Sequence, residues 1–315
     1  ILSGKQVAML CPTTLLCRQH YERALDRFSQ FDVRIAVFSR LIDESKQKQY
    51  MKGVEDGSIH MAIGTHRLLS KQIKFNNLGL LIIDEEQRFG VEQKELIKEL
   101  KKNVDVLTLT ATPIPRTLQM SLLGIRGLSQ INTPPSNRMP IQTYVMPQKD
   151  EVVIELISKE LARKGQVFYL HNQVADIYST ALKLEHKIKG ARVGVAHGQM
   201  DKDAIEDIMI KFYNGDIDVL VCTSIIETGI DIPNVNMIII ENADKFGLSQ
   251  LYQIKGRVGR GNRIAYAYLL YKPNKVLNDT ARKRLKAISD FTELGSGYKI
   301  AQRDLMIRGA GDILG

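Results

Sequence analysis

The chain has 315 residues, 44% of them hydrophobic and 25% charged, which is the composition of a globular protein with about two domains. Its net charge of +9 fits a polyanionic partner, and it fits a lysine-rich solvated surface equally well. Three cysteines without a CxxC pair argue against structural zinc and for a reducing, cytoplasmic setting. No apolar run approaches the roughly 20 residues that span a bilayer, so no membrane segment is expected.

Short aliphatic and β-branched runs alternate with segments that have apolar residues at three- and four-residue spacing. Strands are predicted at 6–10, 34–38, 60–64, 78–84 and 105–110, and again at 143–146, 166–170, 192–196, 218–222, 237–241 and 265–271. Such runs do not alternate with polar residues, which is typical of strands buried on both faces of a parallel sheet. Helical segments such as 15–28 and 201–213 separate them, so the sequence predicts α/β architecture with two doubly wound parallel sheets.

The domain boundary is predicted near 133–138, where two adjacent prolines interrupt any regular element. From about residue 279 the pattern changes to a basic amphipathic helix at 281–291, a Gly-Ser-Gly turn and a second short helix. We therefore predict a first domain at 1–135, a second at 136–275 and a helical hairpin at 276–315. No internal sequence repeat is evident.

Three carboxylates, Asp84, Glu85 and Glu86, stand directly at the end of a predicted buried strand. Ligands of open α/β sheets bind beyond the carboxyl ends of the strands, so chemistry is expected here. Asp84 could hold Mg²⁺ through water, and Glu85 could deprotonate an attacking water molecule. If this run is considered alone, an acidic surface turn is a better explanation of it than a catalytic site.

Two further runs also follow predicted strands. Thr110 and Thr112 place two hydroxyls beside the same sheet edge, although hydroxyls before proline commonly cap helices or turns. In the run 223–231, Gly229 and Asp231 could approach a ribose or phosphate, and Thr223 could donate to a backbone phosphate. The alternative interpretation of the run 223–231 is a polar loop before a proline.

A fourth run, 253–260, carries Arg257 and Arg260, which we expect on one face of a helix. Planar guanidinium groups suit bidentate contact with a γ-phosphate and could act as arginine fingers across a cleft between the two domains. A basic helix face is the alternative for this run alone, but the four runs in this order make it improbable. A metal-dependent nuclease that used the three carboxylates would leave both arginines without a role.

Together these runs resemble the motifs of superfamily 2 helicases over the whole chain. In chain order, the segments that match motifs Ia, Ib, II, III, V and VI are 12–16, 64–69, 84–87, 110–113, 223–231 and 253–260. The resemblance implies two RecA-like domains, the cofactors ATP and Mg²⁺, and catalytic roles for Asp84, Glu85, Gln87, Arg257 and Arg260. It also implies that the nucleotide contacts Gly229 and Asp231.

The same resemblance assigns residues to DNA binding and to coupling. The expected DNA contacts are Thr13, Thr14, Gly64, Thr65, His66, His197, Gln199, Thr223 and Glu227. The residues expected to couple nucleotide state to domain closure and DNA movement are Thr110, Thr112, Gln253, Arg303 and Arg308. The last two lie on the predicted hairpin.

Narrower features resemble the RecG and Mfd branch of double-stranded DNA translocases. They are the runs 84–91, 110–117 and 245–250 and the helical tail. Glu86, where RecG proteins usually have Gln, and Ala310, where they usually have Pro, favour the Mfd transcription-repair coupling factors. That family implies double-stranded DNA as partner, with RNA polymerase and UvrA bound through regions outside this chain. A RecG-like branched-DNA helicase is the alternative.

One family motif is missing from the chain. The phosphate-binding loop GxxxxGK[ST] does not occur, and Ser3-Gly4-Lys5 lacks its upstream glycine and precedes a strand where the loop should follow one. The resemblance implies that the chain is a fragment, with the loop a few tens of residues before Ile1. We therefore expect ATP hydrolysis in the parent protein and, in this chain, a DNA-binding module without turnover.

Overall fold

The computed structural model describes residues 1–100, 104–110, 127, 129, 131, 140–224, 232–261, 263–274, 276–290 and 300. These residues form two compact units, the first up to Thr110 and the second from Gly127 onward. The predicted boundary near 133–138 and the second helix of the predicted hairpin lie outside the described residues. Among those described, no helix is long and apolar enough to cross a membrane.

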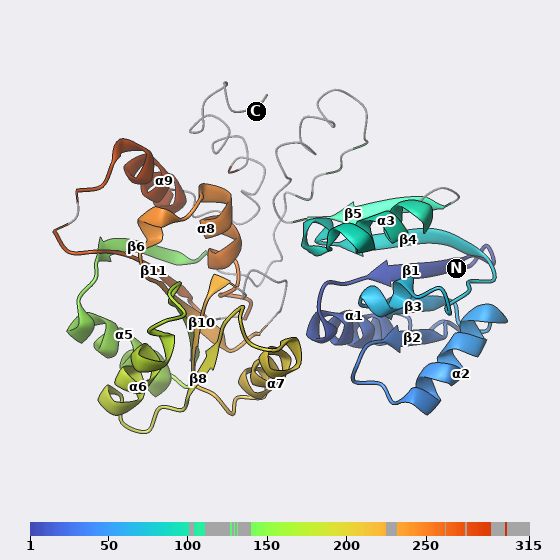
Figure 1. Ribbon diagram of the computed structural model, residues 1–315, viewed down its shortest axis with the longest axis horizontal. Helices are drawn as coiled ribbons and strands as arrows, with labels where there is room; N and C mark the ends of the chain where they lie inside the picture. The colour runs from blue at the N-terminus through green and yellow to red at the C-terminus, as the bar shows by residue number, and fades with distance from the viewer. Residues whose placement is uncertain are drawn as a thin grey trace. The chain divides into compact units, whose positions relative to one another are not determined.

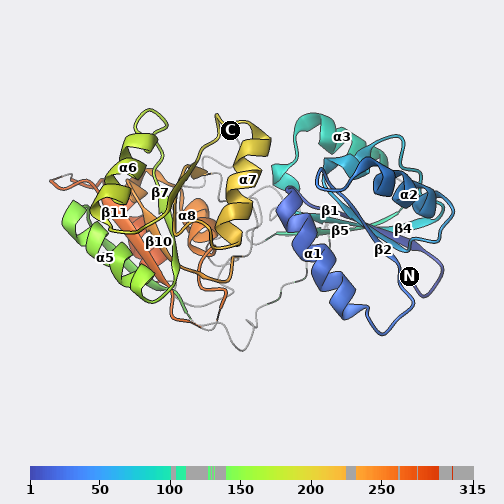
Figure 2. The ribbon, with the colours of Figure 1, turned by 90° about the horizontal axis from the view of Figure 1, so that it is seen from below.

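The first unit is a five-stranded parallel sheet with helices on both faces (Figures 1 and 2). Its strands are β1 (Gln6–Leu10), β2 (Ile35–Phe38), β3 (Met61–Gly64), β4 (Leu78–Asp84) and β5 (Asp105–Leu109), in the spatial order β2-β3-β1-β4-β5. Its helices are α1 (Thr14–Arg27), α2 (Glu44–Glu55) and α3 (Val91–Leu100), with 3₁₀ turns η1 (His66–Leu69) and η2 (Glu86–Arg88). Helix α1 covers one face of the sheet, and α2 and α3 cover the other (Figure 2).

The second unit has a six-stranded parallel sheet in the order β6-β11-β10-β7-β9-β8. Its strands are β6 (Gln142–Pro147), β7 (Gln166–Leu170), β8 (Val193–Ala196), β9 (Val219–Cys222), β10 (Val235–Ile240) and β11 (Tyr266–Tyr271). Its helices are α5 (Asp150–Ala162), α6 (Ile177–Lys187), α7 (Lys202–Tyr213), the 3₁₀ turn η5 (Ala243–Lys245), α8 (Leu248–Lys255) and α9 (Asp279–Asp290). The predicted α/β class with two doubly wound parallel sheets is confirmed.

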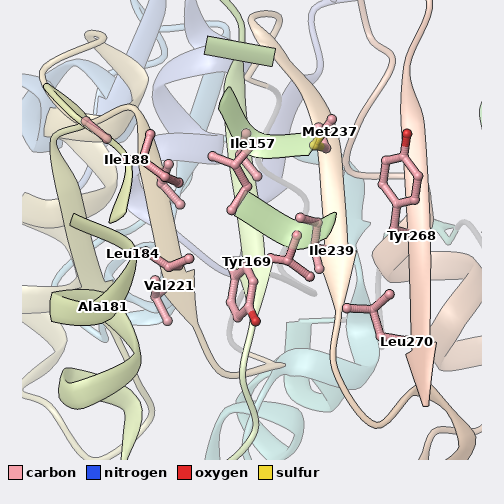
Figure 3. Packing of buried hydrophobic residues seen from close by; sticks show 14 of the residues in the cluster. Ile157, Tyr169, Ala181, Leu184, Ile188, Val221, Met237, Ile239, Tyr268 and Leu270 are labelled. Carbon is pink, nitrogen blue, oxygen red and sulfur yellow. The ribbon is translucent and has the colours of Figure 1, made fainter. Parts of the chain in front are cut away.

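The central strands are buried on both faces, as their unbroken apolar runs predict. In β1, Ala8 and Leu10 pack with α2 and α3, whereas Val7 and Met9 pack with α1. In the second unit, α5 and α6 cover one face, where Ile157 and Leu184 lie among side chains of β7, β9, β10 and β11 (Figure 3). Successive side chains of a strand point to opposite faces, so each sheet builds two cores.

The two units repeat one arrangement of strands. Read from β8, the second sheet runs β8-β9-β7-β10-β11, which matches β2-β3-β1-β4-β5 strand for strand, with β6 added beside β11. Gln6 opens β1 and donates from Nε2 to two backbone carbonyls, one in α2 and one just before β3, at 2.9 and 2.8 Å. Gln166 opens β7 and makes the same two bonds, to Phe212 in α7 and to Ile217 shortly before β9, both at 2.7 Å. Asp43 caps α2 and Asp201 caps α7.

The repeat includes two unusual backbone positions. Gly57 and Gly215 follow the equivalent helices α2 and α7 at φ +80° and +84°. After β4, Glu85 is left-handed at φ 51°, and after β10 its counterpart Asn242 is left-handed at φ 49°. A 3₁₀ turn, a buried phenylalanine and a glycine then follow in both units. The two predicted doubly wound domains therefore share one geometry, although few residue identities remain between them.

Candidate functional site

Asp84 ends β4, at the carboxyl edge of the first sheet, where parallel α/β sheets bind their ligands. Its Oδ2 atom lies 3.1 Å from Nε2 of His20 on α1. The Asp84 side chain remains 17% exposed. The carboxylate is thus oriented by a hydrogen bond from a neighbouring helix and is still accessible to a ligand.

A magnesium ion fits this carboxylate in a particular way. The described residues include no group of three or more His, Cys, Asp and Glu side chains that could hold a metal. Mg²⁺ does not need such a cage, because it usually keeps several waters and binds one or two carboxylates together with substrate phosphates. Asp84 suits that mode, in which the ion would polarise and neutralise phosphate oxygens.

Glu85 combines burial with backbone strain. Its side chain is buried, and its φ of 51° and ψ of 53° lie in the left-handed region, which costs on the order of 1–2 kcal/mol for a residue with a Cβ atom. The backbone N–H of Glu85 donates to the carbonyl oxygen of Leu109 at 3.1 Å, which ties the turn to β5. Strain of this kind clusters at functional sites, so the geometry favours a functional role for Glu85.

The neighbouring residues tie the acidic turn to β5. Thr108 donates from Oγ1 to Oε2 of Glu86 at 3.4 Å, so the third carboxylate is tied to the sheet. Thr110 follows β5 directly, and the register pairs Asp84 with Leu109, so Thr110 lies at the same sheet edge as the carboxylates. The backbone of Gln87 lies in η2, whereas its side chain and the whole of Thr112 are outside the described residues.

The second unit holds a closed counterpart of this site. Glu241 follows β10 as Asp84 ends β4, but both of its carboxylate oxygens are occupied. Oε1 accepts from the hydroxyl of Tyr169 and from Nε2 of Gln148 at 2.9 Å, and Oε2 lies 2.6 Å from Nδ1 of His171. Glu241 is only 6% exposed. Both oxygens of this carboxylate are thus held by neighbouring side chains, whereas the Asp84 carboxylate contacts His20 through one oxygen and is more exposed.

His171 is the charged centre of that closed cluster. Its Nε2 lies 2.7 Å from Oδ1 of Asp176, so each ring nitrogen faces a carboxylate oxygen. The hydrogen bond to Glu241 raises the pKa of His171 to about 9, although burial opposes the shift. An imidazolium between two carboxylates at neutral pH has no lone pair, so His171 is not a general base.

The arginine run differs from its predicted form. Helix α8 ends at Lys255, and Gly259, left-handed at φ +71°, separates the two arginines. Arg257 is buried in the second unit, and Arg260 is partly buried, with Nε 3.4 Å from the carbonyl oxygen of Gly256. The expectation that both arginines share one helical face is therefore wrong, because α8 ends at Lys255, before either arginine. Gln253 remains inside α8.

The predicted DNA contacts of the first unit gather at the sheet edge that carries Asp84. Thr13 and Thr65 follow the paired strands β1 and β3, after Gly64 has ended β3. Both hydroxyls cap helices, because Thr13 accepts from the N–H of Leu16 at 3.3 Å and Thr65 from that of Arg67 at 3.5 Å. Thr14 is buried in α1, and His66 is exposed in η1.

The predicted contacts of the second unit follow the paired strands β8 and β9. His197 is buried, and its Nε2 lies 3.1 Å from the hydroxyl of Tyr178. Thr223 is buried beside it and donates its backbone N–H to the residue before His197 at 3.2 Å, while Gln199 is exposed. The remaining predicted site residues, which lie outside those described, are Glu227, Gly229, Asp231, Arg303 and Arg308.

Three residues of these sites escape sequence reasoning. His20 lies in an ordinary amphipathic helix, and only the structure brings it to Asp84. Glu241 had a signal, since the run Ile239–Gly247 reads IIENADKFG against IIDEEQRFG at 82–90. Lys255 looks like a surface lysine but is 4% exposed.

Helicase family models match parts of both units. The DEAD/DEAH box helicase model matches residues 1–121, and the helicase conserved C-terminal domain model matches residues 148–262. RecG bound to a three-way DNA junction shares 35% identity with a TM-score of 0.81, over 98% of this chain and 41% of RecG. Yeast Dbp5 bound to RNA and ADP BeF3 shares the fold at 18% identity and a TM-score of 0.65, over 99% of this chain and 82% of Dbp5.

Curated relatives match along the whole chain. The transcription-repair-coupling factors of Staphylococcus epidermidis and Staphylococcus haemolyticus are 57% and 56% identical over all 315 residues. The chain spans 27% of the length of each of these relatives. The chain is therefore, over its whole length, a homologue of the transcription-repair-coupling factors, and its two parts match helicase domain models.

Proposed function

We propose that the protein is an ATP-dependent double-stranded DNA translocase that displaces stalled RNA polymerase in transcription-coupled repair. The observation that carries this proposal is the accessible Asp84 carboxylate beside the strained, buried Glu85, in a chain homologous throughout to the transcription-repair-coupling factors. Because the chain spans 27% of those relatives, the proposal concerns the whole protein. Contacts with RNA polymerase and UvrA are assigned to regions outside this chain.

In this proposal the first unit supplies the hydrolytic groups. Asp84, whose carboxylate His20 orients, would hold Mg²⁺, which would neutralise charge on the phosphate oxygens, and Glu85 would accept a proton from the water that attacks the γ-phosphate. Arg257 and Arg260 stabilise the charge on the phosphoryl group, which can contribute about 10³-fold or more to the rate. Gly229 and Asp231 contact the nucleotide.

The DNA contacts are assigned to the sheet edges. Thr13 and Thr65 both cap the start of helical turns, and helix starts favour phosphate oxygens, so we assign the DNA backbone to these turns. His197, Gln199 and Thr223 take the equivalent place in the second unit. The other proposed DNA contacts are Thr14, Gly64, His66 and Glu227, and the proposed coupling residues are Gln87, Thr110, Thr112, Gln253, Arg303 and Arg308.

For the 315-residue chain by itself we propose DNA binding without ATP turnover. Ser3-Gly4-Lys5 precedes β1, with Gly4 in a turn at φ +75°. The strands of the sheet are parallel, so this tripeptide lies at the amino edge, whereas Asp84 lies at the carboxyl edge. Five residues of extended strand separate the two edges by roughly 16 Å, so these N–H groups are too far away to cradle phosphates beside Asp84.

A RecG-like helicase of branched DNA is the second candidate function. The structural match to RecG on a three-way junction, at 35% identity, favours it. Linear and branched substrates separate the two candidates. A translocase of the first kind displaces a triplex strand from linear duplex, whereas a RecG-like enzyme acts mainly on junctions.

The test uses the natural full-length protein and its Glu85→Gln variant. We expect Glu85→Gln to reduce DNA-stimulated ATP hydrolysis at least 100-fold while the Kd for duplex DNA stays within twofold. Retained turnover would refute the base assignment. Hydrolysis by residues 1–315 alone would refute the proposal that this chain does not turn over ATP.

A further inference from the structure

Tyr178 and His197 form a polar pair at the carboxyl edge of the second sheet. Tyr178 lies in the first turn of α6, which comes after β7, and His197 follows β8 directly. The tyrosine hydroxyl lies 3.1 Å from Nε2 of His197, and the two rings meet edge to face, with centroids 5.6 Å apart and planes at 89°. Tyr178 is 54% exposed, whereas His197 is only 7% exposed. A buried imidazole therefore holds an exposed phenol in place.

The contact between the two side chains leaves one hydrogen-bond donor unused. A neutral imidazole has one N–H group and a phenol has one O–H group, so two donors share a single mutual hydrogen bond. Nδ1 of His197 is buried and has no hydrogen-bond partner among the described residues. Among buried backbone groups an N–H without an acceptor is rarer than an under-satisfied carbonyl, and the same preference places the proton of His197 on Nε2. Nε2 then donates to the phenol oxygen, and the exposed O–H group of Tyr178 is free to donate to a ligand.

The surroundings of this O–H group indicate its ligand. Helix α6 packs on β8 and β9, whose carboxyl ends carry His197 and Thr223. These two ends are joined by the hydrogen bond from the backbone N–H of Thr223 to the carbonyl oxygen of Ala196, at 3.2 Å. Tyrosine hydroxyls are among the groups that contact phosphate oxygens in protein–DNA complexes. An exposed aromatic residue also suits a protein interface, but an oriented donor beside residues assigned to DNA favours a phosphate oxygen.

We propose that Tyr178 is a further DNA-binding residue, whose hydroxyl donates to a phosphate oxygen of duplex DNA, and that His197 is the positioning residue that orients it. This inference rests on the proposed function, because it places the duplex at the carboxyl edge of the second sheet. The contact is uncharged, so it differs from one made by lysine or arginine. Its strength should therefore depend little on salt concentration.

The test measures the Kd for duplex DNA of the natural full-length protein, with a non-hydrolysable ATP analogue, at several salt concentrations. Tyr178→Phe removes the hydroxyl and keeps the ring. Tyr144→Phe is the matched control, because Tyr144 is 46% exposed and lies on β6, at the far side of the sheet from β8. In a second measurement, the photoreactive p-benzoylphenylalanine replaces either tyrosine, and the protein is irradiated with labelled duplex. In a third, His197→Leu is combined with Tyr178→Phe.

We expect Tyr178→Phe to raise the Kd about fivefold, which is the effect of losing one net hydrogen bond. The slope of log Kd against log salt concentration should stay that of the wild type, whereas loss of a lysine or arginine contact would change it by about 1. Tyr144→Phe should match the wild type. The photoreactive residue should cross-link to the duplex from position 178 and not from position 144. His197→Leu should raise the Kd of the wild type more than that of Tyr178→Phe, because the variant has no hydroxyl to orient.

Three results would overturn the inference. An unchanged Kd in Tyr178→Phe would show that the hydroxyl makes no contact with DNA. Weaker binding without cross-linking from position 178 would show that the tyrosine acts only through the fold or through a protein partner. Equal effects of His197→Leu in both backgrounds would remove the positioning role of His197. A wild-type protein that does not bind duplex DNA would instead overturn the proposed function, and this inference with it.

Discussion

The protonated His171 makes the stability of the second unit fall as the pH rises. Its pKa is about 9, against an ordinary value of 6.5, so the folded state binds a proton that the unfolded state has released over this range. A raised folded-state pKa contributes stability that is complete below pH 6.5 and is lost as the pH rises through 9. We test this with His171→Gln, which removes the titrating group and keeps one hydrogen-bond donor.

The magnitude follows from the two pKa values. The difference of 9 − 6.5 = 2.5 corresponds to about 3 kcal/mol, at 1.36 kcal/mol for each pKa unit. About half of this remains at pH 8. The free energy of unfolding of the wild type minus that of His171→Gln should therefore fall by about 3 kcal/mol between pH 6 and pH 10. Subtracting the variant is essential, because Lys255 contributes a pH dependence of the opposite sign. Its pKa is lowered to about 8 in the folded state, so its titration makes the protein more stable above pH 8.

Urea denaturation at several pH values, followed by near-ultraviolet circular dichroism, measures this difference. The chain has no tryptophan, and nine of its eleven tyrosines follow residue 140, so the signal reports mainly the second unit. His186→Gln, on the exposed side of α6, is the control and should keep the pH dependence of the wild type. A difference between wild type and His171→Gln that stays constant from pH 6 to pH 10 would refute the assigned protonation.

Three further predictions concern single residues. Gln6→Leu and Gln166→Leu each leave two buried carbonyls without their donor. Urea denaturation should therefore show that each variant lowers the free energy of unfolding of its own unit by about 2 kcal/mol or more. If only one of the two variants were destabilised, the two glutamines would not have equivalent roles. Glu85→Asn places at this position the residue found at the equivalent Asn242, and asparagine tolerates the left-handed conformation better than glutamate. The free energy of unfolding of the first unit should rise by up to about 1 kcal/mol, while the full-length protein loses ATP hydrolysis. A less stable variant would show that strain is not the dominant effect. Thr13→Ala removes a helix cap and should lower the free energy of unfolding of the first unit by about 1 kcal/mol, whereas Thr13→Asn should preserve it. A weaker DNA affinity in both variants would support a direct contact between the threonine and DNA.

Local sequence patterns predict the elements of this fold closely. The runs 6–10, 78–84 and 166–170 are strands with the predicted bounds, and α7 begins one residue after the predicted start. The reason is that strands buried on both faces require unbroken apolar runs, and helices between them require three- and four-residue spacing. The position of Asp84 at a strand end is likewise local information. The arginine run is different, because the sequence spacing of Arg257 and Arg260 does not reveal that Gly259 turns left-handed between them.

The sequence by itself determines the two parallel-sheet units, the acidic turn after β4 and the relationship to superfamily 2 helicases. Only the tertiary structure decides which polar side chains meet. His20 reaches Asp84 from 64 residues away, three side chains close over Glu241, and Lys255 joins α9 across 33 residues. These contacts depend on how helices lie on a sheet, and no single segment encodes that arrangement. The same carboxylate position is therefore open in the first unit and closed in the second, although the two runs that carry it look alike.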